Sequence, residues 1–139
     1  MAQAVDSVVV HVDGGARGNP GPAGIAAVAA GVGGETLREE SAYIGVASNN
    51  VAEYRALLLG LKVAEELGAR EVEVVCDSQL VARQVGGQYR VKHAGLRPLY
   101  QEAMAALGRF DRWSVRDVRR EQNHRADELV NAALDAAVG

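Results

Sequence analysis

Two apolar stretches of this chain are each followed directly by an aspartate. Residues 8–12 lead into Asp13, and residues 72–76 lead into Asp77. Short stretches of this kind, rich in valine, are typical of strands that are buried in a sheet. Because the carboxyl ends of neighbouring parallel strands face one crevice of an α/β sheet, we expect the two carboxylates to lie at the same edge.

The remaining segments alternate around these two strands in a pattern that predicts an α/β fold. The pair Gly33 and Gly34 predicts a hairpin, and Gly68 predicts the end of the first helix. Gly60 and Ala64 lie on one stripe of that helix, which favours a close approach to the sheet. Expected strands cover residues 5–13, 23–32, 36–45, 71–77 and 113–119, with a turn at 14–22, and expected helices cover 50–67, 78–85, 94–107 and 123–137. The order β-β-β-α-β-α-α-β-α predicts a mixed sheet with helices packed on it.

Length and charge limit the possible functions. The chain has 139 residues, which suits one domain of common size, and we expect residues 1–139 to form a single domain. The formal net charge of -3 argues against gross electrostatic binding to nucleic acid. The positive charge is nearly all arginine and is dense between Arg109 and Arg125. Because arginine favours bidentate contacts with phosphate, local phosphate binding stays possible there.

Cys76 is the only cysteine in the sequence. This excludes an intrachain disulfide and a cysteine-based zinc site, and a reduced cytosolic setting is the default for such a chain. Residues 1–4 lack the basic start of a signal peptide. The apolar stretch at 23–32 is too short to span a membrane. We therefore expect a soluble, cytoplasmic protein with no membrane partner and, by default, a monomer.

Two further acids lie at the starts of expected helices. Glu53 closely follows the polar residues 48–50, and Asp127 lies in the first turn of the last helix. Gathered carboxylates repel one another unless a cation holds them, and hard oxygen ligands suit Mg²⁺ or Mn²⁺. Metal-assisted cleavage of a phosphodiester is the chemistry predicted by the four acids Asp13, Glu53, Asp77 and Asp127.

Each of the four acids also has a purely structural interpretation. Asp13 precedes two glycines and suits a turn. Asn50 and Glu53 have the spacing of a capping box, and Asp77 suits the cap of the helix that follows it. Asp127 suits the positive end of a helix dipole. Spacing alone leaves both interpretations open, because only a fold can bring the acids together.

The sequences around the four acids resemble those of the type 1 ribonuclease H family. They are VDGGARGNPGPAG at 12–24, SNNVAEYRAL at 48–57, CDSQLV at 76–81 and NHRADEL at 123–129. The four stretches follow the family's order with similar spacing, and the resemblance extends over nearly the whole chain. Residues 87–100 are similar to the compact members, which lack the large basic handle inserted in some relatives.

The resemblance implies a ribonuclease H-like fold, with a five-stranded mixed sheet flanked by helices. It also implies endonucleolytic cleavage of the RNA strand of RNA/DNA hybrids, leaving 5′-phosphate and 3′-hydroxyl ends. The family's metal ligands match Asp13, Glu53, Asp77 and Asp127, which would hold two Mg²⁺ ions, with Mn²⁺ as a substitute. One ion would activate water and the other would stabilise the leaving 3′-oxygen, with Asp13 bridging the two.

Four amide side chains match family positions that approach the minor groove of the hybrid, namely Asn19, Asn49, Asn50 and Gln79. Amides both donate and accept hydrogen bonds, so they can meet base edges and the ribose 2′-hydroxyl that distinguishes RNA from DNA. Helix capping is the structural alternative for Asn49 and Asn50. Turn formation is the alternative for Asn19.

Two positions depart from the family's pattern. Many relatives carry a mobile catalytic histidine well before the last aspartate, whereas the only candidate here is His124, three residues before Asp127. Its imidazole would assist product departure or proton transfer near neutral pH, and the alternative is an exposed histidine at a helix start. Gly15 stands where many relatives have a small polar side chain, so any substrate contact there would use the backbone.

Two competing functions stay open. The same fold could act on double-stranded RNA or on a branched DNA junction; the amide residues disfavour the junction but leave double-stranded RNA as a second substrate. Alternatively, the chain could bind hybrids without cleaving them. Intact acids at all four positions argue against that, because a binding module has no need to confine four carboxylates beside phosphates.

Overall fold

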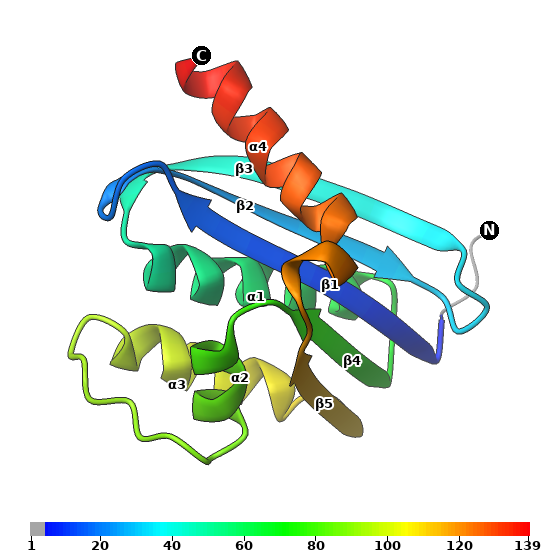
Figure 1. The fold of residues 1–139 in the computed structure, drawn as a ribbon. Helices are drawn as coiled ribbons and strands as arrows, with labels where there is room; N and C mark the ends of the chain where they lie inside the picture. Colours follow the sequence, from blue (N-terminus) through cyan, green and yellow to red (C-terminus); the bar gives the residue numbers. More distant parts are fainter. Residues whose placement is uncertain (1–4) are drawn as a thin grey trace.

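The computed structural model describes residues 5–139, and Figure 1 shows the arrangement of their five strands and four α-helices. The strands are β1 (Ser7–Ala16), β2 (Gly21–Ala30), β3 (Thr36–Ala47), β4 (Glu71–Cys76) and β5 (Arg112–Asp117). The helices are α1 (Asn49–Glu66), α2 (Gln79–Val85), α3 (Arg97–Leu107) and α4 (His124–Val138), with a 3₁₀ turn at Arg120–Gln122. The predicted order of strands and helices is confirmed. Residues 1–4, on which the prediction about a signal peptide rests, lie outside the described residues.

The five strands form one mixed sheet, as predicted, and their order in it is β3-β2-β1-β4-β5. β1 pairs antiparallel with β2 and parallel with β4, and β4 pairs parallel with β5. In the parallel register His11 lies opposite Val75. Asp13 and Asp77 each follow two residues later, so the topology brings them to the same edge of the sheet.

The first strand is longer than the sequence predicts. We expected residues 14–22 to form a turn, but β1 continues to Ala16. The parallel ladder with β4 ends at His11, whereas the antiparallel ladder with β2 places Asp13 opposite Ala26 and continues to Ala16. Asp13 is therefore inside a strand, and its interpretation as a turn residue is wrong.

Other elements also begin or end elsewhere than predicted. β2 begins and ends two residues earlier than expected, and β3 ends two residues later. α3 begins at Arg97 rather than at residue 94, with Pro98 in its first turn. Proline has no backbone N–H to donate, so it suits the first turn of a helix and not its interior. β5 ends at Asp117 rather than at residue 119, because its pairing with β4 ends there.

α1, α2 and α3 lie on one side of the sheet, where the main hydrophobic core is found. Alternate residues of β1, namely Val8, Val10 and Val12, belong to this core. α1 approaches the strand closely at Gly60, because a β-carbon there would come within 2.5 Å of Val12. The close approach predicted from the small-residue stripe is thus confirmed. Gly68 adopts a positive φ of 80° directly after the helix, as expected for its end.

α4 crosses the other face of the sheet, over β1, β2 and β3 (Figure 1). Its apolar contact is small, with Val130 and Leu134 packed on Ala26 of β2. Gly24 of the same strand allows this approach, since a β-carbon there would lie 3.2 Å from the carbonyl oxygen of Val130. Among residues 5–139, no helix has both the length and the apolar character needed to cross a membrane.

Candidate active site

Three of the predicted acids meet at the carboxyl edge of the parallel strands. Asp13 lies in β1, Glu53 near the start of α1 and Asp77 directly after β4. Each offers one carboxylate oxygen, and these three oxygens lie within 4.8 Å of one another. We call this group the three-carboxylate cluster. Its oxygens are close enough to share a single cation.

A glycine brings Glu53 to Asp13. Gly14 follows Asp13 in β1, and its backbone N–H donates a 3.1 Å hydrogen bond to Oε1 of Glu53. A β-carbon at Gly14 would collide with the carbonyl group of Ala52, so the strand and the helix approach this closely only without one. The fold thus carries the Glu53 carboxylate to the strand that bears Asp13.

Serines, and not the acids, cap the two helices beside the cluster. The hydroxyls of Ser48 and Ser78 each accept a 3.2 Å hydrogen bond from the backbone N–H three residues later. The capping-box interpretation of Asn50 and Glu53 is therefore wrong, and so is the interpretation of Asp77 as a helix cap. Both carboxylates contribute to the cluster instead.

The Asp77 carboxylate indicates whether the site suits a metal ion. Its Oδ2 atom is buried and has no hydrogen-bond partner among the described residues. Nε of Arg120 lies 3.8 Å from that oxygen, which makes an ion pair but is too long for a hydrogen bond. A buried anionic oxygen without a donor is costly, and a bound cation would remove that cost. The residues present therefore fit a hard divalent cation.

Burial and mutual repulsion control the protonation of the cluster. Burial raises the pKa of Asp13, and the negative charges of Asp77 and Glu53 raise it further. Burial and the charge of Asp77 also raise the pKa of Glu53, while the hydrogen bond from Gly14 lowers it. At neutral pH the cluster without metal therefore retains protons, which a divalent cation would displace.

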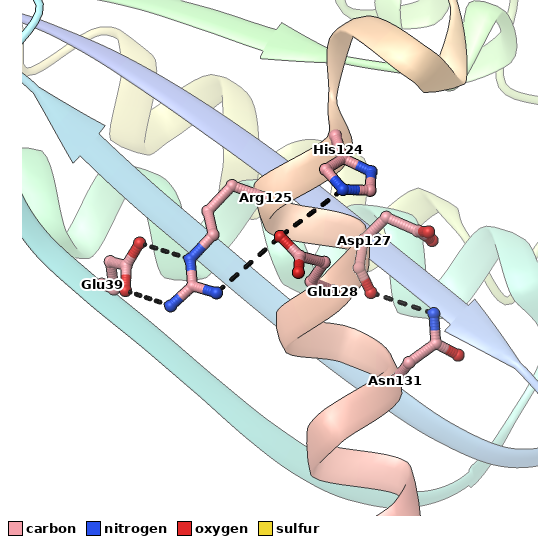
Figure 2. Close-up of polar contacts among 6 residues, drawn as sticks. All are labelled: Glu39, His124, Arg125, Asp127, Glu128 and Asn131. Atoms are coloured by element: carbon pink, nitrogen blue, oxygen red, sulfur yellow. Dashed lines mark hydrogen bonds and ion pairs between the residues drawn. The ribbon is translucent and has the colours of Figure 1, made fainter.

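The fourth acid, Asp127, lies in the first turn of α4 (Figure 2). It lines the same cleft of about 620 Å³ as Asp13, Glu53 and Asp77 but lies outside the three-carboxylate cluster. Its charge contributes to the raised pKa of Asp13, so these two carboxylates interact across the cleft. The cleft thus receives three acids from the β1, α1 and β4 side and one from α4.

Comparisons with known proteins agree with this arrangement. A family model described as reverse transcriptase-like matches residues 11–133. The crystal structure of RNase H1 from the halophilic archaeon Halobacterium salinarum is 41% identical, with a TM-score of 0.91 over 94% of this chain and 98% of that one. The chain belongs to the type 1 ribonuclease H family. The ribonuclease H-like fold predicted from the sequence is thereby confirmed.

Two further members of the ribonuclease H family extend the comparison. LC11-RNase H1, solved in complex with an RNA/DNA hybrid, is 43% identical with a TM-score of 0.91, covering 95% of this chain and 99% of that one. The bifunctional protein Rv2228c of Mycobacterium tuberculosis is 49% identical over 131 residues, which cover 94% of this chain and 36% of that protein. The chain thus spans about a third of the length of this curated relative.

Two of the predicted substrate residues also join the β1–β2 turn to α1. Oδ1 of Asn49 accepts a 2.9 Å hydrogen bond from Ala16, and Oδ1 of Asn19 accepts a 3.1 Å bond from the N–H of Asn49. Each amide has an NH₂ group as well, and both residues are exposed. Asn50 and Gln79 are exposed too. The structure therefore places all four amides where they are accessible to a substrate.

His124 lies at the start of α4. Its side chain is 75% exposed, and its Nε2 atom lies 3.7 Å from Oε1 of Glu128, one turn along the helix (Figure 2). His124 is not among the described residues that line the acidic cleft. The catalytic role expected from its sequence position stays a prediction.

Two residues near the cleft were not predicted as site residues. Arg120 lines the cleft and pairs with Asp77, although its only signal in the sequence is its place in the arginine-rich segment. Asn123 is buried, and its Nδ2 atom donates a 2.8 Å hydrogen bond to the carbonyl of Val12 in β1. These partners are 111 residues apart, so no local pattern could have revealed the contact.

Proposed function

We propose that this chain is a metal-dependent endoribonuclease that hydrolyses the RNA strand of RNA/DNA hybrids. The observation that carries the proposal is the three-carboxylate cluster, together with the buried and unpartnered Oδ2 atom of Asp77. Family membership supports it, and so does the relative LC11-RNase H1, which was solved with an RNA/DNA hybrid. The products would carry 5′-phosphate and 3′-hydroxyl ends.

Asp13, Glu53, Asp77 and Asp127 would hold two Mg²⁺ ions, for which Mn²⁺ would substitute. Carboxylate oxygens are the donors that such hard cations prefer. When bound, ions of this kind activate a water nucleophile and neutralise charge that develops on the leaving oxygen. Among the chain's own residues Asp13 is central, because the charges of the other three acids all act on it.

The arginines at the edge of the cleft would receive the phosphate backbone. Arg119 and Arg120 line the cleft, and Arg120 lies beside Asp77. A guanidinium can hold a phosphate through two parallel N–H···O bonds. It would also offset part of the acidic charge that otherwise repels a polyanion. A net charge of -3 is therefore compatible with a nucleic-acid substrate.

Selection of RNA-containing duplexes would rest on the four amides Asn19, Asn49, Asn50 and Gln79. Amide donors reach base edges and 2′-hydroxyl groups without demanding a sequence. The hydrogen bonds that Asn19 and Asn49 accept hold these two side chains in place before a substrate arrives. Double-stranded RNA is the second candidate substrate, because it presents 2′-hydroxyl groups as well.

We further propose that residues 1–139 act as a single domain and as a monomer in the cytoplasm. One main core, with a smaller apolar cluster under α4, supports a single domain over residues 5–139. The lone Cys76 is buried, which suits a reducing compartment. Gel filtration with light scattering would test the monomer, and a dimer mass would contradict it.

Cleavage of an end-labelled RNA strand tests the proposed function. The strand is presented in an RNA/DNA hybrid, in double-stranded RNA and alone, each with Mg²⁺, Mn²⁺ or EDTA. We expect metal-dependent cleavage of the hybrid by the wild-type protein and a severe loss of cleavage by Asp77→Asn. Equal cleavage of double-stranded RNA would widen the substrate class. Folded protein that binds the hybrid without cutting it would instead support a binding module.

A further inference from the structure

α4 carries Asp127, the one acid of the four that lies outside the three-carboxylate cluster. The helix rests on the sheet through Val130 and Leu134, which pack on Ala26 one to two turns beyond Asp127. Ala126 in the first turn is buried too, but it offers only a methyl group. These contacts leave the rotation of the first turn weakly determined. Other contacts must place that turn, and the Asp127 carboxylate with it.

Arg125 attaches the first turn of α4 to β3. Its Nε and Nη2 atoms donate hydrogen bonds of 2.8 Å to the two carboxylate oxygens of Glu39 (Figure 2). This bidentate arrangement restrains the relative orientation of the two side chains as well as their separation. The hydrogen bonds from Arg125 also hold the pKa of Glu39 below its usual range, so the pair is ionised at neutral pH.

Asn123 attaches the start of the same helix to β1, through its 2.8 Å hydrogen bond to Val12. The two tethers therefore reach the strands on either side of β2. Figure 2 shows Arg125 and Asp127 on opposite sides of α4, as expected for residues two positions apart. A contact that holds Arg125 on one side therefore also restrains the rotation of the helix turn that carries Asp127 on the other.

We infer that Glu39 and Arg125 are positioning residues for Asp127, and that their ion pair between β3 and α4 sets its distance from the three-carboxylate cluster. Neither residue is among the described residues that line the cleft, so both act through the helix rather than on the substrate. Glu128 offers Arg125 a competing partner, with 3.8 Å between Nη1 and Oε1. Loss of Glu39 would let Arg125 turn to Glu128 and release the helix from β3.

Glu39→Gln tests the inference, because it keeps the shape of the side chain and removes its charge. Calorimetric titration with Mg²⁺ should show about tenfold weaker binding, the scale of losing a residue that orients a metal ligand. Turnover of the hybrid at fixed Mg²⁺ should fall while the KM for hybrid stays the same, because no substrate contact is removed. Arg125→Lys should act in the same direction with a smaller effect, since it keeps the charge but not the bidentate geometry.

Glu66→Gln is the matched control. Glu66 pairs at 2.7 Å with Arg38, the neighbour of Glu39 in β3, and the exposure of the two pairs is comparable. That pair joins β3 to α1 rather than to α4. Glu66→Gln should therefore leave Mg²⁺ affinity unchanged. If Glu39 only stabilised the fold, Glu39→Gln would also leave Mg²⁺ affinity unchanged. Glu39→Gln and Glu66→Gln would then lower the thermal midpoint by similar amounts.

The charge-swapped double variant Glu39→Arg/Arg125→Glu should recover part of the Mg²⁺ affinity that each single change removes. Unchanged Mg²⁺ affinity in Glu39→Gln, or a loss equal to that in Glu66→Gln, would overturn the inference. The turnover readout rests on the proposed function, but Mg²⁺ titration does not. Wild-type protein that binds Mg²⁺ without cutting hybrid would contradict the proposed function alone, and wild-type protein that binds no Mg²⁺ would overturn both.

Discussion

The two faces of the sheet hold their helices in different ways. On the side of α1, α2 and α3 the contact is a continuous core that includes Leu57 and Leu61 of α1. Under α4 the buried apolar cluster found among residues 5–139 consists of Ala26, Val130 and Leu134. Burial of a leucine contributes roughly 1.5–3 kcal/mol, so apolar packing holds α1 far more firmly than it holds α4.

The acids of the cleft are divided between these two faces. Asp13, Glu53 and Asp77 belong to elements that the main core ties together, whereas Asp127 belongs to α4, whose first turn is placed by polar tethers. Apolar burial is non-directional, while a hydrogen bond constrains direction. Packing of the main core therefore positions three of the carboxylates as the protein folds. The position of the fourth depends on two polar tethers, each of which a single substitution removes.

The largest expected effect separates the acids of the two faces. Asp77→Asn should lower kcat on hybrid by on the order of 10³-fold, the scale of losing a principal charge-stabilising group. Asp127→Asn should lower it less, because its carboxylate lies outside the three-carboxylate cluster. Steady-state rates at saturating Mg²⁺, with circular dichroism to establish folding, measure the difference. Equal losses would show that both faces contribute equally to the reaction.

Gly14 and Gly15 form a matched pair on the side of the main core. Gly14→Ala should destabilise the protein by about 1–3 kcal/mol, because its methyl group would collide with Ala52 and push α1 from β1. Glu53 moves with that helix, so kcat should fall too. Gly15→Ala should change neither, since a β-carbon there would have no atom within 4 Å apart from those of its own residue and its two chain neighbours. Urea unfolding and hybrid cleavage check the pair, and similar losses in both would contradict the steric argument.

Leu57→Ala and Leu134→Ala compare α1 with α4 at equal chemistry. Each removes a buried leucine, so each should cost about 2–5 kcal/mol of unfolding free energy, with Leu134→Ala at the lower end. Leu134→Ala should also raise the Mg²⁺ concentration for half-maximal cleavage, because α4 is held by few apolar contacts. Leu57→Ala should leave that concentration unchanged when rates refer to folded protein. The opposite ranking would contradict the distinction between the two faces.

Without metal, the stability of the protein should fall as pH rises. The pKa values of Asp13 and Glu53 are raised in the folded state, so the folded protein retains protons that the unfolded chain releases above about pH 4. Their stabilising contribution is complete below that pH and is lost as pH rises through the raised folded-state values. Thermal unfolding in EDTA at increasing pH measures this. Asp13→Asn should flatten the profile and raise Tm at alkaline pH, and a wild-type Tm that rises instead would exclude the proposed repulsion.

The smallest effect is expected at His124, for which we propose a role in product departure or proton transfer. Its side chain is exposed and lies 3.7 Å from Glu128, and it is not among the described residues that line the cleft. His124→Ala should therefore slow turnover by less than the roughly 10²-fold that marks the lower end for general acid–base catalysts. Single-turnover and steady-state rates would show whether the step affected is chemistry or release. A loss as complete as that of Asp77→Asn would show that the exposed position is not the one that acts.

The common edge of Asp13 and Asp77 could be predicted, because it follows from a local pattern and one rule of sheet topology. Each aspartate follows an apolar stretch. Because His11 pairs with Val75 in the parallel register, Asp13 and Asp77 lie at the same height along the two strands. The first helix could also be predicted from the sequence, since the expected range of 50–67 lies within one residue of Asn49–Glu66 at both ends. Such features depend on neighbours in sequence, which a single chain displays directly.

The features that could not be predicted depend on partners far apart in the chain. β1 continues past Asp13 only because β2 pairs with it there. Glu39 and Arg125 are 86 positions apart in the sequence, with no local pattern to join them. The error at Glu53 has the same cause, because the donor that it accepts from, Gly14, belongs to another element. The capping-box rule described the spacing of Asn50 and Glu53 correctly, but it takes no account of a hydrogen-bond donor elsewhere in the chain.

Gly60 is not among the described residues that line the cleft, yet it sets the depth at which α1 rests on β1. It follows Glu53 by two helical turns, about 10 Å along the axis. A helix of this length moves as a rod, so a side chain at position 60 would lift the rod and draw the Glu53 carboxylate from Asp13. In a library of random variants, substitutions at Gly60 should therefore lower activity, as substitutions of the metal ligands do. A map of mutational sensitivity should therefore extend down the axis of α1 rather than form a sphere around the reacting atoms.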